Sequence, residues 1–316
     1  MTMISVIIPN YNHGKFLEQS TISVLNQSNS DFEIIIVNDG STDDSLDVIL
    51  SLQRQDKRVK LINLENNCGM INAINIGIKA SIGKYFFGLA ADDFLISKNF
   101  FSDAVQALSI SECTGFFGKT EIVDQSFSKR IGFLGSSKRD GLINKKDVLK
   151  DFLLSKIFIP GSSSIWKKEE ILKIGLFDET LGPQADYFVN HFIAILGGVV
   201  FHDNVYTCMR SFENSYGNSI DPIQYLNNHS KIIDRILAEN IVDCDYLVKN
   251  WKLRVIENVF PEKRVAKYLG NVKKINERAH IYKLPKELRF IISQLNDYDV
   301  QFKENLNVAK KIMKIF

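Results

Sequence analysis

The sequence predicts an α/β fold with a mixed, mainly parallel sheet, helices on both faces of that sheet, and a C-terminal helical extension. Short apolar segments alternate with segments of helical spacing four times within the first 90 residues, a pattern typical of a parallel sheet covered by helices. Polar residues follow three of the predicted strands. With 316 residues, 45% of them apolar and 24% charged, the chain can bury a substantial core.

The first hundred residues give the clearest pattern. Apolar, β-branched runs bounded by turn residues predict strands at 5–9, 33–38, 59–63 and 84–90. Apolar residues at helical spacing predict helices between them, at 14–27 and 70–81. Another helix is predicted to run through about residue 54, with Ser41, Thr42 or Asp43 as its cap.

Beyond residue 100 the pattern is looser. It predicts a helix near 97–111, a strand near 115–123, polar turns through about 145, a loop entering a strand at GSSSIW (161–166), a helix at 185–196 and a strand within 197–210. From about residue 221 the chain is predicted to be helical to its end, with breaks at Pro261 and Pro285.

Composition argues against several classes of protein. The net charge of +2 gives no case for nucleic-acid binding. Four well-separated cysteines form no CxxC pair, which argues against a zinc site and a disulfide framework and favours a cytoplasmic location. The sequence opens without a signal peptide and contains no run of about 18 apolar residues.

The basic residues are concentrated in the last third of the chain. Residues 216–316 carry 18 Lys and Arg against 12 Asp and Glu, and they end in the basic amphipathic sequence NVAKKIMKIF. Such a tail would suit peripheral contact with the anionic inner face of a membrane. The alternative is an ordinary helix that packs on the domain or on a second copy in a homo-oligomer.

Polar residues gather where three of the predicted strands end. Because parallel strands present their carboxyl ends at one edge of a sheet, these residues are expected to form one site. Two adjacent carboxylates at the end of a buried strand repel each other, so they indicate either a solvated turn or a bound cation. The three clusters are Pro9, Asn10 and Tyr11; Asn38 and Asp39; and Asp92 and Asp93.

Seven segments, in their order and spacing, resemble the family-2 glycosyltransferases of the GT-A fold. They are SVIIPNYN, DFEIIIVNDGSTDDS, NCG, NAINIGI, AADD, GLFDE and the AD at 185–186. The resemblance covers residues 3–215. It implies transfer of a sugar from a nucleotide-sugar to a hydroxyl, with inversion at the anomeric carbon. It also implies a GT-A domain at 1–215, with a nucleotide-binding half (1–100), an acceptor half (101–215) and the extension (216–316).

The resemblance also implies roles for the residues on the donor side. Asp92 would hold a Mn²⁺ or Mg²⁺ ion on the diphosphate, and Asp93 would support it or contact the nucleotide. Asp39 would accept the imide N–H of the base, which leaves UDP and dTDP as alternatives, with UDP preferred. Pro9 and Tyr11 would form the platform under the base. The competing interpretation of Asp39 is an Asx turn.

On the acceptor side, the resemblance makes Asp186 the catalytic base, with helix capping as its alternative. Ser163 and Trp166 of GSSSIW supply a hydroxyl and an indole suited to a sugar, with a plain turn as the alternative interpretation. Arg210 is expected on this side as well, and its alternative, shared with Lys15, is to replace the basic nucleotide contact that Ile74 lacks. The chain is rich in Ile, Asn and Lys, as in an AT-rich bacterium. Such enzymes commonly build surface polysaccharide on glycan or lipid-linked acceptors.

Three residues depart from the family pattern. Ala90, Ile74 and Phe212 stand where the family commonly has Asp, Arg and His. The loss of these polar groups from the donor site leaves metal dependence open. It also motivates a second hypothesis, a nucleotide-sugar-binding or scaffold protein of the same fold that has lost turnover. Nucleotidyl transfer ranks last, because IPNYNHGKF lacks a Gly-rich basic loop.

Overall fold

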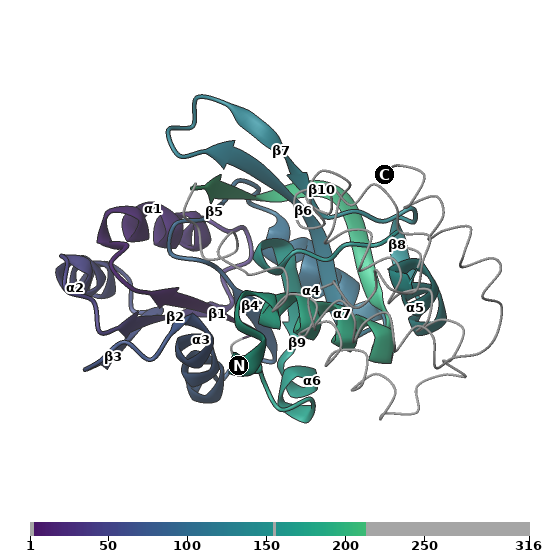
Figure 1. Ribbon diagram of the computed structural model, residues 1–316, viewed down its shortest axis with the longest axis horizontal. Helices are drawn as coiled ribbons and strands as arrows, with labels where there is room; N and C mark the ends of the chain where they lie inside the picture. The colour runs from purple at the N-terminus through teal and green to yellow at the C-terminus, as the bar shows by residue number, and fades with distance from the viewer. Residues whose placement is uncertain (1–2, 154–155, 213–316) are drawn as a thin grey trace, which may run out of the picture. The chain divides into compact units, whose positions relative to one another are not determined.

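The computed structural model describes residues 3–153 and 156–212 (Figure 1). The predicted extension, with its breaks at Pro261 and Pro285 and its basic tail, lies outside the described residues. Among the residues described, no helix is both long and apolar enough to span a bilayer.

A ten-stranded mixed sheet forms the centre of the described region (Figure 1). Its strands follow the order β3-β2-β1-β4-β9-β6-β10-β5, with β7 beside β6 and β8 beside β10. Their bounds are β1 Ile4–Asn10, β2 Phe32–Asp39, β3 Val59–Leu64, β4 Tyr85–Gly88, β5 Phe94–Leu95, β6 Gly115–Asp124, β7 Arg130–Leu134, β8 Gly141–Ile143, β9 Ser164–Lys167 and β10 Val199–Ser211.

Strand direction divides the sheet into two parts. The first four strands are parallel, in the order β3-β2-β1-β4. Strand β9 then runs antiparallel to both β4 and β6, and β10 returns parallel to β6. This mixed sheet with a parallel first half confirms the predicted α/β fold class.

The helices fill the intervals between strands. They are α1 Gly14–Leu25, α2 Ser45–Gln55, α3 Met70–Ala80, α4 Phe100–Ile110, α5 Lys145–Leu153, α6 Lys168–Lys173 and α7 Ala185–Gly197, with single 3₁₀ segments η1 at Gly161–Ser163 and η2 at Glu179–Gln184. The helices predicted near 97–111 and 185–196 correspond to α4 and α7. The polar turns predicted through 145 were wrong in part, because β7 and β8 lie there.

Both faces of the parallel strands are covered, as the alternation of side chains requires. Val6 and Ile8 belong to the same buried cluster as Leu17 of α1. Ile7 points to the other face, where a side chain added at Gly77 of α3 would lie 2.4 Å from it. Helix α3 therefore packs close to the sheet because position 77 is a glycine.

The carboxyl ends of β1, β2 and β4 fall at one edge of the sheet. Asn10 pairs in register with Asn38 at the ends of β1 and β2. Strand β4 ends at Gly88, although Leu89 still donates its N–H to Ile7 O at 3.0 Å, and the chain then turns through Asp93. Strand β1 lies between the other two, so the three polar clusters face one region.

Candidate active site

Two interlocking loops follow β1 and β2. The Asn12 side chain accepts the N–H of Thr42 at 2.8 Å, and the Asn12 N–H donates to Ser41 Oγ at 3.0 Å. Asp43 accepts the N–H of Gly14, where α1 begins, at 3.0 Å. These contacts fix the loop that carries Tyr11, whose side chain is 45% exposed. An exposed ring on a fixed loop can serve as a surface for stacking.

A ladder of three asparagines crosses the ends of β1, β2 and β3. Asn10 Nδ2 donates to Asn38 Oδ1 at 3.2 Å, and Asn38 Nδ2 donates to Asn63 Oδ1 at 2.8 Å. These residues are paired in register on neighbouring parallel strands. Asn38 is therefore an uncharged member of a hydrogen-bonded row.

The Asp39 side chain binds the backbone of the loop before α3, about 30 residues away in the sequence, and not the backbone of its own turn. The residue is buried, and its two carboxylate oxygens accept the N–H groups of Cys68 and Gly69 at 2.8 and 2.9 Å. Both donors belong to the NCG segment that leads into α3. The Asx-turn alternative does not describe these contacts. Asp39 links β2 to this segment at the same sheet edge as Tyr11.

Replacing Asp39 with Asn should loosen this link. An amide has a single acceptor oxygen, so its NH₂ group would face one of the two backbone N–H donors. We expect a loss of about 1–3 kcal/mol in the free energy of unfolding, measured by urea denaturation. Asp31→Asn at an exposed position is the control. Equal stability of the two variants would contradict the anchoring role.

The Asp92–Asp93 turn separates its two carboxylates by environment. Asp93 is 4% exposed, and its Oδ1 accepts the backbone N–H of Arg210 at 3.2 Å. Burial, and then the neighbouring Asp92 carboxylate, raise the pKa of Asp93 well above its usual range. Asp92 remains partly exposed. The turn thus offers one outer carboxylate and keeps the other inside.

Arg210 lies beside this turn, which corrects its predicted place on the acceptor side. Its guanidinium donates to the backbone oxygen of Asp92 and to Gln19 Oε1. The side chain is 5% exposed. No sequence pattern points to Gln19, because a glutamine on a helix is ordinarily solvated.

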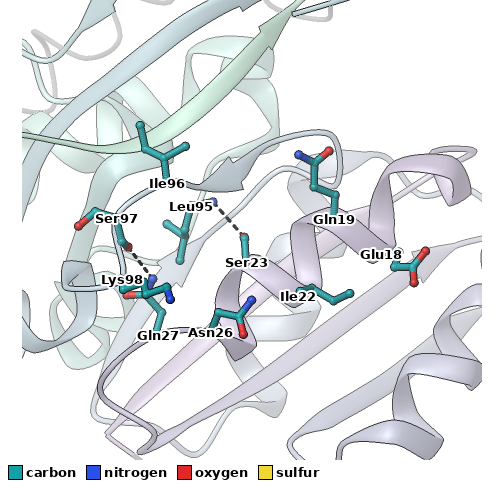
Figure 2. A pocket seen from close by; sticks show the side chains of 10 residues that line it. All are labelled: Glu18, Gln19, Ile22, Ser23, Asn26, Gln27, Leu95, Ile96, Ser97 and Lys98. Carbon is teal, nitrogen blue, oxygen red and sulfur yellow. Dashed lines mark hydrogen bonds between the residues drawn. The ribbon is translucent and has the colours of Figure 1, made fainter.

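A groove of about 490 Å³ runs between α1 and the segment after the turn, and Gln19 is among the residues that line it (Figure 2). Leu95 donates its N–H to Ser23 Oγ at 2.9 Å, and Gln27 Nε2 donates to Ser97 O at 2.7 Å. Figure 2 shows these two bonds holding the segment against α1. Gln19 connects the groove to the Asp92–Asp93 turn through Arg210, which donates to both Gln19 and Asp92.

Asp186 lies in the first turn of α7, against η1. Its Oδ1 accepts the Tyr187 N–H at 2.7 Å, and a Cβ added at Gly161 would lie 2.8 Å from its Oδ2. Only glycine leaves room for the carboxylate at this approach. Asn190, one turn further along α7, is 2% exposed, and its Nδ2 would lie 3.6 Å from the same Cβ. Burial raises the pKa of Asp186.

Two residues predicted for the acceptor side belong to the protein interior. Trp166 is fully buried and donates its indole N–H to Ser164 Oγ at 3.0 Å. Ser163 is also fully buried, donating to Gly118 O and accepting from Thr120 Oγ1, each at 2.9 Å. In this structure neither side chain is exposed to a sugar. The prediction failed for Trp166 because β9 is a central strand, between β4 and β6, and for Ser163 because its hydroxyl is bonded within the core.

Two of the recognised segments contact each other although they are about a hundred residues apart. Asn75 of NAINIGI and Phe177 of GLFDE exchange two hydrogen bonds, at 2.8 and 3.1 Å. Asn72 donates to Glu179 at 2.8 Å. These contacts fix α3 to the segment that precedes α7, and hence to Asp186.

Apolar contacts occupy two of the three departures from the family pattern. The Phe212 ring packs on Phe16, with centroids 6.0 Å apart. Ile74 Cδ1 would lie 3.2 Å from a Cβ at Gly88, where β4 ends. These positions supply packing, in place of the charge usual in the family, near the sheet edge where the three polar clusters gather.

The sheet edge with the three polar clusters suits a cation that takes most of its coordinating atoms from a bound molecule and from water. Within the two described ranges, no group of three or more His, Cys, Asp and Glu residues could enclose a metal ion. Mg²⁺ commonly takes one or two carboxylates, with phosphate oxygens and waters as its other ligands. The partly exposed Asp92 fits that pattern.

The fold and the clustered sheet edge are those of a GT-A-type domain. The glycosyl transferase family 2 model matches residues 5–167, more than half of the chain. The chain belongs to glycosyl transferase family 2.

Curated relatives match over parts of their length. A stretch of 148 residues is 34% identical to an uncharacterized glycosyltransferase of Haemophilus influenzae, covering 46% of this chain and 45% of that protein. Another, of 124 residues, is 33% identical to the glycosyltransferase GlyG of Streptococcus pneumoniae and covers 39% and 41%. The chain thus spans less than half the length of these relatives.

Solved structures support the fold. Staphylococcus aureus TarS, residues 1–349 in complex with UDP-GlcNAc, superposes with a TM-score of 0.67 at 19% identity, covering 92% of this chain and 83% of that one. The mannosyltransferase PcManGT from Pyrobaculum calidifontis, in complex with GDP-Man and Mn²⁺, gives 0.56 at 14%, covering 99% and 80%. At these identities the likeness shows the GT-A architecture alone.

Proposed function

We propose that this chain is an inverting glycosyltransferase that transfers a sugar from a UDP-sugar to a hydroxyl of a glycan or lipid-linked acceptor. The supporting observation is the meeting of Tyr11, Asp39 and the Asp92–Asp93 turn at one sheet edge. Asp186 is connected to that edge, because η1 packs against both α7 and β4, the strand that leads into the turn.

Asp186 would act as the base. An acceptor hydroxyl would give its proton to the Asp186 carboxylate while its oxygen bonds to the anomeric carbon and the bond from that carbon to the diphosphate oxygen breaks. The position of Asp186 in the first turn of α7, on a residue that is partly exposed as a whole, suits this role. Its raised pKa makes it a stronger proton acceptor than an ordinary carboxylate.

Asp92 would hold a Mn²⁺ or Mg²⁺ ion on the diphosphate, and that ion would supply charge to neutralise the departing group. Asp39 would accept the imide N–H of the base. Both of its oxygens already bind backbone donors, yet a carboxylate offers about four lone-pair sites. Uracil and thymine present the same imide edge, so UDP and dTDP share this contact.

The cellular part of the proposal rests on composition and on the sequence outside the described residues. We place the protein in surface polysaccharide synthesis at the cytoplasmic face of the inner membrane. The domains would be 1–215 and 216–316, the first divided near residue 100. The basic extension would bring the enzyme to a lipid-linked acceptor. Loss of vesicle co-sedimentation on deleting residues 216–316 would support this role.

Calorimetry of UDP, dTDP, GDP and CDP, each with and without Mn²⁺, tests the donor site. We expect UDP to bind more tightly with Mn²⁺, and Asp92→Ala to lower this gain in affinity while leaving metal-free binding within about twofold. The gain should fall by about 10-fold or more, the usual scale of lost metal ligation. Asp31→Ala, at an exposed position, is the control. A UDP affinity that changes neither with Mn²⁺ nor with the Asp92→Ala substitution would refute the metal-binding role of Asp92.

The alternative function is nucleotide-sugar binding without turnover. The apolar packing of Ile74 and Phe212 at the donor edge favours it. The two proposals differ in donor hydrolysis. Slow release of UDP from UDP-sugars by the wild-type chain, lost in Asp92→Ala, would exclude the binding-only alternative. Donor binding without any hydrolysis or transfer would favour it.

A further inference from the structure

Arg210 is enclosed by aromatic rings from three parts of the fold. Its guanidinium carbon lies 4.7 Å from the ring centroid of Phe16 in α1, 5.3 Å from that of Phe94 in β5, and 4.5 Å from that of Phe127 in the β6–β7 turn. A guanidinium is weakly hydrated and stacks well on aromatic faces, which makes it a cation suited to such a box.

The same residue contacts both members of the Asp92–Asp93 turn through different groups. Its side chain donates to the Asp92 backbone oxygen, while its backbone N–H donates to Asp93 Oδ1. The other arm of the guanidinium donates to Gln19. One residue therefore holds the backbone of the outer carboxylate and the side chain of the inner one.

Strand β10 delivers Arg210 to this position. Thr207 and Cys208 of β10 pair with β5, directly after the turn, and Tyr206 O accepts the Ile96 N–H at 2.9 Å. The turn itself starts at Ala90, whose methyl group can make no hydrogen bond where the family commonly has an aspartate. The Asp93 N–H donates to Ala90 O at 3.0 Å within the turn, and β10 adds side-chain and backbone contacts from outside the turn's own sequence.

We propose that Arg210 is a positioning residue that locks the Asp92–Asp93 turn so that the Asp92 carboxylate is presented to the cation on the donor diphosphate. This inference rests on the proposed function, since it assigns Asp92 to that cation. Arg210 acts through the turn, and its planar fork is essential because two of its N–H groups serve different acceptors. A lysine would keep the charge and lose the fork.

Two measurements on Arg210→Lys test the proposal. In hydrogen exchange, amides of residues 92–97 and 124–130 should exchange about tenfold faster, because losing the Arg210 side-chain contacts lowers the free energy of local opening. The exchange rates of the α7 amides should stay unchanged. In calorimetry, the gain in UDP affinity from Mn²⁺ should fall about 10-fold, as for lost support of a metal ligand, with metal-free UDP binding preserved. Arg210→Met should show both effects.

Arg58→Lys is the matched control. Arg58 also stacks on a phenylalanine, 4.4 Å from the Phe32 centroid, and pairs with Asp56 at 2.8 Å, away from the turn. It should change neither measurement. Unchanged hydrogen exchange in both Arg210 variants would refute the claim that Arg210 holds the Asp92–Asp93 turn. Faster exchange with an intact Mn²⁺ gain would overturn the positioning role. A wild-type chain that binds no nucleotide would refute the proposed function, and exchange would still decide whether Arg210 holds the turn.

Discussion

Asp186→Asn should reduce sugar transfer by about 10²–10⁴-fold, the usual contribution of a positioned general base. The amide keeps the shape of the side chain but cannot take a proton from the acceptor. UDP affinity should stay unchanged, because Asp186 lies on α7 and the proposed nucleotide contacts lie on the strand ends. Release of UDP in the presence of acceptor measures the rate, and calorimetry measures the affinity.

The same variant should be more stable than the wild type at neutral pH. Burial raises the pKa of Asp186 in the folded protein, so above the unfolded pKa ionisation favours the unfolded chain. Wild-type stability is therefore lost as pH rises from the unfolded value through the raised folded value. The Asp186→Asn substitution removes this loss. The unfolding free energies of the two proteins should therefore become equal near about pH 3, below the ordinary carboxyl range.

Urea unfolding at both pH values checks the stability difference. Gly161→Ala provides a second variant, because the added Cβ would meet Asp186 Oδ2 without altering the carboxyl group itself. It should also lower transfer. An Asp186→Asn protein that retains transfer, or one that is less stable than the wild type at neutral pH, would leave Asp186 with a structural role such as helix capping.

Trp166→Ala should cost about 3–5 kcal/mol of unfolding free energy, the range for removing a large buried aromatic side chain. Trp166 is fully buried in β9, and its six-membered ring lies so close to Gly115 of β6 that a Cβ there would approach within 2.2 Å. Alanine would leave a cavity between neighbouring strands and release the hydrogen bond to Ser164. Chemical denaturation gives the loss directly.

Trp166→Phe separates packing from sugar binding. It retains a ring in the core and removes the indole N–H, so it should cost about 1–3 kcal/mol for the changed volume and the lost hydrogen bond, while Ser164 Oγ still donates to Gly161 O. The hypothesis that the indole stacks on a sugar makes a different prediction. It requires Trp166→Ala to keep wild-type stability and to lose acceptor affinity.

The first half of the fold could be predicted from sequence because each element there is strongly periodic. Segments 33–38 and 70–81 carry unambiguous strand and helix patterns, and both elements form nearly as predicted. Strand β7 (Arg130–Leu134) was missed because it is short, with three of its five residues exposed. Such a strand is specified by its pairing with β6, which local sequence does not reveal.

The site could be predicted only where topology decides position. Parallel strands must present Asp39 and Asp92 at the same edge, and they do. Trp166 and Arg210 were misplaced because their environments depend on long-range pairing. GSSSIW looks like an exposed loop until β9 is inserted between β4 and β6, and Arg210 reaches the turn because β10 pairs with β5.

The asparagine ladder across β1, β2 and β3 has a direction as well as a neutral charge. Each amide donates to the next, from Asn10 through Asn38 to Asn63. Carboxamides neither gain nor lose protons in the range where carboxyl groups titrate. The three asparagine side chains therefore do not titrate. Any pH dependence of nucleotide binding would come from the neighbouring carboxylates and from the phosphates of the ligand. An aspartate at position 38 would introduce a titrating group and remove the N–H group that donates to Asn63 Oδ1.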